Sequence, residues 1–356
     1  MASQLLDLDV VSGWLDSRRE RLGPRVQGAR AVRVEQLSRG VSRETWAVDA
    51  VVRGPDGERE LPLAVRRDHP AGSVIPSDLR TEYEVYARLA DTAVPVARAL
   101  WFEDDAAVAP DGRPGYVRER VRGSWHLPFL SDDDPARDDR RIEASRVHLE
   151  ALAAVHLVDW RTCGFDRLFP VPSSPAAAAV ELLERVRRQA EELLGEASPV
   201  LAEACSALAA RAPRDAPAVV LCKGTNGHGE EVWRDGRIVA MSDWELACLG
   251  DPAYDLAQVQ EMVPTIVRDG RRVWGWPEAL EHYTSRSGLV VTEERLRWYR
   301  DLYAVLQLAY CAHSGAAVRR LGATAPLRFV WTAYEVAYHA ERKLAAVAAS
   351  ARSATT

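Results

Sequence analysis

The sequence lacks the features that mark a membrane protein, a secreted protein or a general nucleic-acid binder. Its first residues contain no basic segment followed by an apolar run, so no signal peptide is expected. No stretch reaches the roughly 18 apolar residues of a membrane span. The net charge of −6 excludes a sequence-wide attraction to nucleic acid or anionic membrane. These absences predict a globular protein of the cytoplasm without a membrane span or a nucleic-acid partner.

Cysteine is also scarce, and no two cysteines form a C-x-x-C pair. We therefore expect buried or free thiols in a reducing compartment rather than a structural zinc site. Internal repeats and low-complexity segments are absent as well. The chain of 356 residues is long enough for two packed lobes, and the sequence leaves the oligomeric state open. The five cysteines are Cys163, Cys205, Cys222, Cys248 and Cys311.

The first third of the chain has the patterning of an antiparallel sheet with accompanying helices. Gly23-Pro24 ends an amphipathic helix, and Gly54-Pro55-Asp56-Gly57 is a turn between two strand-like runs. Pro76-Ser77 is expected to cap a second helix. The expected elements are helices over 8–22 and 79–89, and strands over 32–37, 45–52, 61–66, 94–101 and 115–121.

Beyond Arg122-Gly123 the spacing of apolar residues becomes helical, with one short β segment in between. That segment comprises strands at 218–221, 231–233 and 238–241, and Asp235-Gly236 between the last two indicates a hairpin turn. The prediction is an α+β protein. Its smaller lobe, residues 1–121, contains the sheet, and its larger lobe, residues 122–356, is mainly helical.

The segment from Leu221 to Ala247 carries the candidate chemistry. It consists of a strand, a glycine-rich loop, a hairpin, and Asp243 at the exit of the hairpin. Phosphoryl transfer requires such an arrangement, because a loop must place groups beside the nucleophile while carboxylates hold magnesium on the phosphates.

The run Ser242-Asp243-Trp244-Glu245, followed by Asp251 and Asp255, resembles the aminoglycoside-phosphotransferase and choline-kinase-like family. It is most similar to the branch that is fused to acyl-CoA dehydrogenases. Members usually read H-G-D-x-x-x-x-N, then a hairpin, then I-D-W-E. The resemblance runs nearly end to end. It implies a protein-kinase-like, two-lobed fold that binds ATP and Mg²⁺ and phosphorylates a hydroxyl of a small molecule.

The resemblance also assigns residues to the nucleotide site. Asp243 matches the metal-binding aspartate, Arg66 stands where the family has a phosphate-binding lysine, and Glu82 matches the glutamate that pairs with that cation. The turn from Ser38 to Ser42 matches the one that covers the phosphates. The remaining matches are Glu119 and Val121 in the hinge that would meet adenine, and His156, which supports the catalytic loop in the family. From the residues alone, His156 on an apolar helix face reads first as a structural histidine, and Asp251 and Asp255 are expected to fix the loop and the helix caps.

Three positions depart from the family pattern. Lys223 replaces the histidine, Thr225 replaces the catalytic aspartate, and Glu230 replaces the metal-binding asparagine. Threonine cannot accept a proton near neutral pH, so the usual general base is missing. Glu230 is still a competent magnesium ligand. His228 and Glu231 are the remaining candidates for a base within the loop.

These departures leave three functional alternatives. The protein is a phosphotransferase with a relocated base, or it uses ATP for another reaction such as dehydration, cyclisation or nucleotidyl transfer, or it is a nucleotide-binding pseudokinase. Lys223 is either a solvated loop charge or a contact to phosphate or substrate. Trp274 and Trp276 either line an acceptor pocket or pack in the core. The apolar helices favour a weakly charged acceptor, such as a lipid-like or polyketide-like alcohol.

Overall fold

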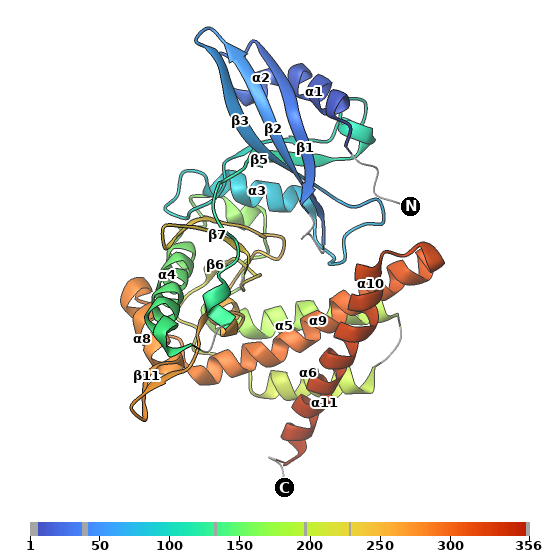
Figure 1. Ribbon diagram of the computed structural model, residues 1–356. Helices are drawn as coiled ribbons and strands as arrows, with labels where there is room; N and C mark the ends of the chain where they lie inside the picture. The colour runs from blue at the N-terminus through green and yellow to red at the C-terminus, as the bar shows by residue number, and fades with distance from the viewer. Residues whose placement is uncertain (1–5, 38–41, 132–133, 196–197, 228, 354–356) are drawn as a thin grey trace.

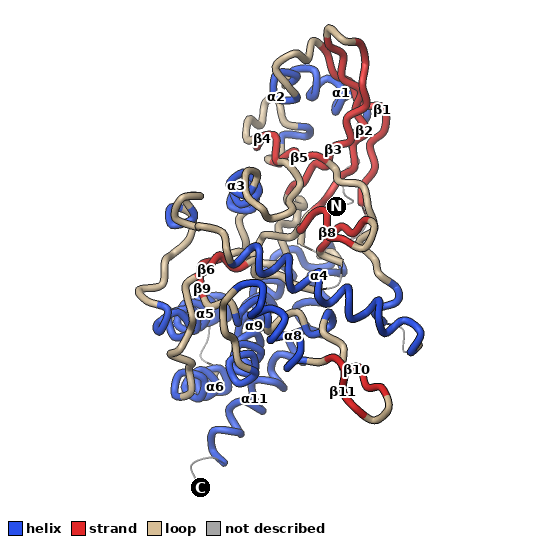
Figure 2. The backbone as a smooth tube through the Cα atoms, turned by 90° about the vertical axis from the view of Figure 1, so that its left-hand side faces the viewer, coloured by secondary structure: helices blue, strands red, loops and turns tan. Residues whose placement is uncertain are grey.

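The structure is a computed structural model that describes residues 6–37, 42–131, 134–195, 198–227 and 229–353. The N-terminal sheet stands at the top of Figure 1, and most of the helices lie below it. Figure 2, turned by 90°, shows the same separation of strands from helices. The predicted α+β arrangement of a sheet-containing lobe and a helical lobe is therefore observed. The division after Val121 stays a prediction.

Within the described residues, five strands form one antiparallel sheet in the order β1-β2-β3-β5-β4. Each expected strand is present, but the one expected over 94–101 begins later. Pro95 instead accepts a backbone hydrogen bond from Met241 at 2.7 Å, which draws this segment away from the sheet. The strands are β1 (Gly28–Leu37), β2 (Glu44–Gly54), β3 (Gly57–Arg67), β4 (Ala99–Glu103) and β5 (Gly115–Glu119).

Three helices pack against this sheet: α1 (Leu8–Ser17), α2 (Arg19–Leu22) and α3 (Leu79–Leu89). The single helix expected over 8–22 is wrong, because the chain breaks at Arg18, whose guanidinium pairs with Glu103 at 2.7 Å. The expected cap of α3 is also wrong. Asp78 is the N-cap, since its carboxylate accepts a hydrogen bond from the Thr81 amide at 2.7 Å.

The helical lobe surrounds the 29-residue α9, which packs against α5 and α11. No helix in the described ranges is both long and apolar enough to cross a membrane. Ser198 is the N-cap of α6, since its hydroxyl oxygen accepts a hydrogen bond from the Leu201 amide. The helices are α4 (Asp138–His156), α5 (Ala178–Leu194), α6 (Pro199–Ala210), α7 (Ala253–Leu256), α8 (Trp276–Ser287), α9 (Glu293–Leu321), α10 (Leu327–Trp331) and α11 (Ala337–Ser353).

Short strand pairs complete the helical lobe. The predicted hairpin turn at Asp235-Gly236 is confirmed, with φ of 52° and 74°. A further hairpin was not predicted, although Asp269-Gly270 repeats the same turn signal with φ of 49° and 72°. The pairs are β6 (Val220–Cys222) with β9 (Cys248–Gly250), β7 (Glu231–Arg234) with β8 (Arg237–Met241), and β10 (Ile266–Arg268) with β11 (Arg271–Trp274).

The buried apolar residues form two main clusters. One fills the space between α1 and the sheet and includes Trp14 and Trp101, whose ring centroids are 5.5 Å apart. The other is continuous from α3 and Tyr116 into the helical lobe. The inner face of the sheet therefore shares its core with the helices below, which fixes α3 beside the glycine-rich loop. All five cysteines are free.

Candidate active site between the lobes

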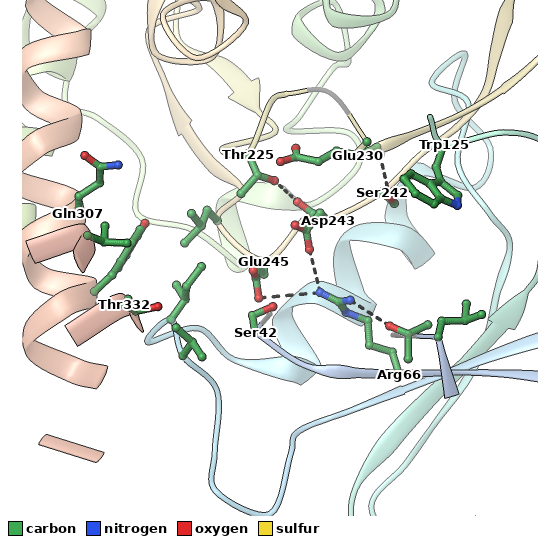
Figure 3. A pocket seen from close by; sticks show the side chains of 18 of the residues that line it. Ser42, Arg66, Trp125, Thr225, Glu230, Ser242, Asp243, Glu245, Gln307 and Thr332 are labelled. Carbon is green, nitrogen blue, oxygen red and sulfur yellow. Dashed lines mark hydrogen bonds and ion pairs between the residues drawn. The ribbon is translucent and has the colours of Figure 1, made fainter. Parts of the chain in front are cut away.

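A cavity of about 790 Å³ lies between the two lobes. Strands β2 and β3 of the sheet, the glycine-rich loop and helix α9 all contribute to its wall. Figure 3 shows Arg66, Thr225, Glu230 and Asp243 gathered on one side, with Gln307 and Thr332 on the helical side. The structure thus brings together residues that are far apart in the sequence.

Arg66 is the electrostatic centre of this side of the cavity. Its Nε lies 3.0 Å from the Glu82 carboxylate, and its Nη2 donates to Oδ1 of Asp243 at 2.8 Å. Burial disfavours the charge of Arg66, but the Glu82 and Asp243 carboxylates outweigh this effect and raise its pKa. Arg66 therefore remains a cation that faces the cavity and positions both carboxylates.

Arg43 is a site residue that the sequence did not indicate. It follows Ser42, which lines the cavity, and its side chain is fully buried. Its Nη1 donates to Glu245 at 2.6 Å and lies 3.3 Å from Glu82. Because Glu82 belongs to α3 and Glu245 follows Asp243, Arg43 connects the sheet-containing lobe to the loop of the helical lobe. An arginine at the start of a strand gave no signal of this role.

The three unusual loop residues contact one another. Lys223 is fully buried, and its Nζ lies 3.0 Å from Oε2 of Glu230 and also donates to the carbonyl of Thr225. The hydroxyl of Thr225 donates to the carbonyl of Asp243. The reading of Lys223 as a solvated charge is wrong, since the residue is buried beneath the loop, whereas its contact to phosphate or substrate stays a prediction. Thr225 and Glu230 do face the cavity.

The backbone of the loop is held by Asp255. Its carboxylate accepts hydrogen bonds from the amides of Lys223 and Gly224 at 2.7 and 2.9 Å. His156 lies 3.1 Å from the same carboxylate, and its other ring nitrogen lies 2.7 Å from the Tyr283 hydroxyl. The expectation that His156 and Asp255 support the loop is confirmed. His156, Cys222 and Asp255 are also close enough to share a metal ion, but Asp255 is already engaged by these donors.

Gly224 is required where the loop passes Leu246. Its φ is 86°, and a Cβ there would lie 2.0 Å from the Leu246 carbonyl oxygen. Only glycine combines this backbone conformation with such a close approach. The glycine of the H-G-D-x-x-x-x-N pattern, which is Gly224 in this chain, therefore has a physical cause.

Glu231 lies under the loop and does not reach the cavity. Its side chain is fully buried, and burial raises its pKa to about 8. The His148 ring lies 3.7 Å away, but burial lowers the pKa of His148 to about 3, so the ring is neutral. Glu231 is thus badly placed to serve as a base toward a ligand. The other candidate, His228, lies outside the described residues.

The structure does not bring every expected residue to the cavity wall. Glu119 and Val121 are absent from the cavity wall, which the neighbouring Arg118 and Trp125 line instead. Among the remaining expected residues, Trp274 is buried, and its Nε1 donates to Ser145 at 3.1 Å. Trp274 belongs to the core, and neither Trp274 nor Trp276 lines this cavity, so their reading as acceptor-site residues stays a prediction.

The helical side of the cavity is aromatic and apolar. Several of its residues come from α9, and others come from α10 and the π-helical turn Thr332–Val336 that follows it. The sequence missed them, because aromatic residues on a helix do not show whether they face a core or a cavity. They are Tyr303, Gln307, Tyr310, Trp331, Thr332 and Val336.

A sheet-containing lobe joined to a helical lobe, with an arginine–glutamate pair and an acidic loop facing the space between them, defines a protein-kinase-like fold. A family model confirms this assignment: residues 33–299 match the phosphotransferase enzyme family, so the chain belongs to that family. It is therefore a kinase-like enzyme of the phosphotransferase type.

Curated relatives support the branch that the sequence suggested. Acyl-CoA dehydrogenase family member 11 of Rattus norvegicus is 23% identical over 245 residues, which is 66% of this chain and 29% of that protein. The same protein of Gallus gallus is 26% identical over 238 residues, covering 65% of this chain and 28% of the relative. The chain thus spans less than a third of the length of these relatives.

Solved structures share the fold. A Ralstonia eutropha protein assigned as an aminoglycoside phosphotransferase has a TM-score of 0.67 at 19% identity, with 98% of each chain covered. The aminoglycoside phosphotransferase APH(4)-Ia, in a ternary complex with AMP-PNP and hygromycin B, has a TM-score of 0.56 at 15% identity over 96% of this chain and 98% of that one. The macrolide 2'-phosphotransferase of Brachybacterium faecium has a TM-score of 0.55 at 19% identity, with 95% of this chain and 97% of that chain covered.

Proposed function

We propose that the interlobe cavity binds ATP with Mg²⁺ and that the protein transfers the γ-phosphoryl group to a hydroxyl of a small molecule. The observation that carries the proposal is the contact of Arg66 with both Glu82 and Asp243 at the cavity wall. This arrangement places a fixed cation and a carboxylate side by side, as the phosphates and the metal of a nucleotide require. The complex of the related APH(4)-Ia with AMP-PNP and hygromycin B supports a nucleotide and a small-molecule acceptor.

The donor set fits magnesium. Asp243 and Glu230 both face the cavity, and carboxylate oxygens are the ligands that this hard cation prefers. When bound, the metal would neutralise charge on the phosphates. Arg66 would contact the phosphates as it moves from Asp243, and Ser42 would lie beside them. Glu230 would remain oriented by Lys223, since that ion pair is buried on the lysine side.

The missing aspartate does not exclude phosphoryl transfer. In the loose transition state of this reaction, positioning and charge stabilisation matter more than proton removal. Glu231 is buried away from the cavity, and Thr225 donates its hydroxyl hydrogen to the Asp243 carbonyl, so neither is placed as a base. The remaining alternatives, another ATP-dependent reaction or a pseudokinase, are separated by the products that ATP yields.

The acceptor is proposed to be a weakly charged, partly apolar alcohol. Tyr303, Tyr310 and Trp331 line the helical side of the cavity. The carboxylates that line the cavity are Glu230, Asp243 and Glu245, all on the loop side and beside Arg66 or Lys223. The described part of the helical wall thus offers no acidic cluster to a polycation.

The central experiment incubates the protein with Mg-ATP and measures thermal stability and nucleotide products. We expect a nucleotide-dependent rise in the melting temperature and the release of ADP, which a lipophilic alcohol stimulates more than hygromycin B does. Release of AMP would contradict phosphoryl transfer and favour another ATP-dependent reaction. Binding of nucleotide without turnover would favour the pseudokinase. The absence of any nucleotide effect would contradict the phosphotransferase, the other ATP-dependent reaction and the pseudokinase alike.

A second experiment tests the site itself. Asp243→Asn should reduce turnover by at least about a hundredfold, because residue 243 would lose the negative charge with which it would bind the metal and pair with Arg66. Asp235→Asn is the matched control, since Asp235 also has a positive φ but lies in an exposed hairpin turn. Equal activity of the two variants would show that the site is misplaced.

A further inference from the structure

A second cavity, of about 690 Å³, lies in the helical lobe away from the interlobe site. It is bounded by the end of α6, the first turns of α9 and the middle of α11, three helices that pack together. Figure 1 shows α6 and α11 at the end of the molecule opposite the N-terminal sheet. The two cavities have no lining residue in common.

The wall of this second cavity is rich in cations. Two of its arginines are already neutralised: Arg211 pairs with Asp301 at 2.8 Å, and Arg295 pairs with Asp215 at 3.0 Å. The other carboxylate in the wall is Glu294. The cations that line the cavity are Arg211, Arg295, Arg297, Arg300 and Lys343.

Three of these cations lack a carboxylate partner among the described residues: Arg297, Arg300 and Lys343. The guanidinium of Arg300 lies over the ring of Trp276, with its Cζ 4.6 Å from the centroid, and its Nε and Nη2 are buried without a hydrogen-bond acceptor. Among the described residues, the ammonium of Lys343 donates to the backbone carbonyl of Arg300, and this bond leaves its charge without a carboxylate contact.

The electrostatic cost of this arrangement is visible in both groups. Burial lowers the pKa of Arg300; the nearby Glu293 opposes this effect only in part, and Arg297 adds to it. Burial also lowers the pKa of Lys343. The nearby Arg300 lowers this pKa further, and Asp301 partly opposes the shift. A buried donor without an acceptor is unfavourable, and a cation without a counter-charge adds to that cost. An anion in the cavity would relieve both.

We propose that this second cavity is a binding site for a small anion with at least two negative charges, of the phosphate-ester or polycarboxylate class. Arg300 and Lys343 lie at its inner wall and Arg297 at its exposed edge. The volume is in the range of small-molecule sites, roughly 300–1,000 Å³. Nothing in this proposal depends on the nucleotide site, so each can fail without the other.

The test uses sodium pyrophosphate and sodium citrate as probes, with sodium chloride at matched ionic strength. Isothermal titration calorimetry without metal should show saturable binding of at least one probe to the full chain. Pyrophosphate would identify phosphate esters as the ligand class, and citrate would identify polycarboxylates. If neither probe binds more tightly than chloride, the proposal is wrong.

Variants then locate the binding. Lys343→Gln and Arg297→Gln should each weaken the probe by about tenfold, because each removes a charged contact. Arg297 is exposed, so its replacement leaves folding intact even if the Lys343 variant is unstable. The exposed Arg59→Gln on β3 is the charge-matched control and should bind as the wild type does. Arg66→Gln should also retain binding. Binding that is lost with Arg66 but unchanged by Arg297→Gln would place the anion in the interlobe cavity and overturn the proposal.

Discussion

The Nζ atom of Lys223 lies 3.0 Å from Oε2 of Glu230, so two residues that both depart from the family pattern form an ion pair with each other. Burial disfavours the ammonium, but Glu230, Glu231 and Asp243 outweigh it and raise the pKa of Lys223. The substitutions at these positions are therefore mutually compensating, and the loop is organised around an internal cation.

Replacing Lys223 by methionine should destabilise the protein by about 3 kcal/mol at pH 7, because it leaves the Glu230 carboxylate in the loop without its counter-charge. The loss should shrink as the pH falls, because burial raises the pKa of Glu230 and protonation removes the charge that Lys223 balances. Urea unfolding monitored by circular dichroism measures both effects. Arg234→Met, which removes an exposed cation on the adjoining hairpin, should cost less than about 0.5 kcal/mol. If both variants lose the same stability at every pH, the ion pair has no structural role.

Glu231 should make stability fall as pH rises. Burial raises its pKa from 4.5 to about 8. Between these values the folded state holds a proton that the unfolded state has released, so this contribution is fully present below about pH 4.5 and is lost by about pH 8. Its limiting slope is about 1.4 kcal/mol per pH unit. Glu231→Gln should flatten the profile in urea unfolding between pH 5 and 8, whereas the exposed Glu192→Gln should not. An unchanged slope in the Glu231 variant would contradict the burial argument.

Gly224→Ala should destabilise the protein by about 3 kcal/mol or more, because a methyl group would overlap the carbonyl oxygen of Leu246. Gly236→Ala is the matched control. It has a similar φ of 74° but open space around it, so it should cost only the backbone strain of about 1 kcal/mol. Chemical denaturation compares the two. Equal losses would mean that backbone conformation alone, and not the close approach, requires glycine at 224.

Thr225→Asp should reduce turnover by about tenfold, rather than restore an ordinary kinase loop, because a carboxylate cannot donate to the Asp243 carbonyl and adds charge beside Glu230. Thr225→Ser keeps the hydroxyl and should remain close to wild type. Steady-state ADP release measures both. A gain of activity in the aspartate variant would instead show that the missing base limits the reaction.

Local patterns were sufficient for much of the secondary structure. The Asp235-Gly236 turn was predicted because its chemistry resides in two adjacent residues. The helix expected over 8–22 was wrong, because Arg18 pairs with Glu103, a partner 85 residues away that no local pattern contains. The boundary error at β4 has the same origin, since Pro95 bonds to Met241.

For the candidate site too, some features could be predicted from the sequence and others required the tertiary structure. By itself, the sequence indicated the frame of the loop and singled out Asp243, Arg66 and Glu82, because glycine requirements and motif spacing are properties of the chain. The structure brings these three residues into contact, and their roles toward a nucleotide stay predictions. Only the tertiary structure decided that Lys223 is buried against Glu230, that Arg43 joins the two lobes, and that α9 supplies the apolar wall. Burial and ion pairing depend on residues brought together across the fold, and the order of residues along the chain does not specify them.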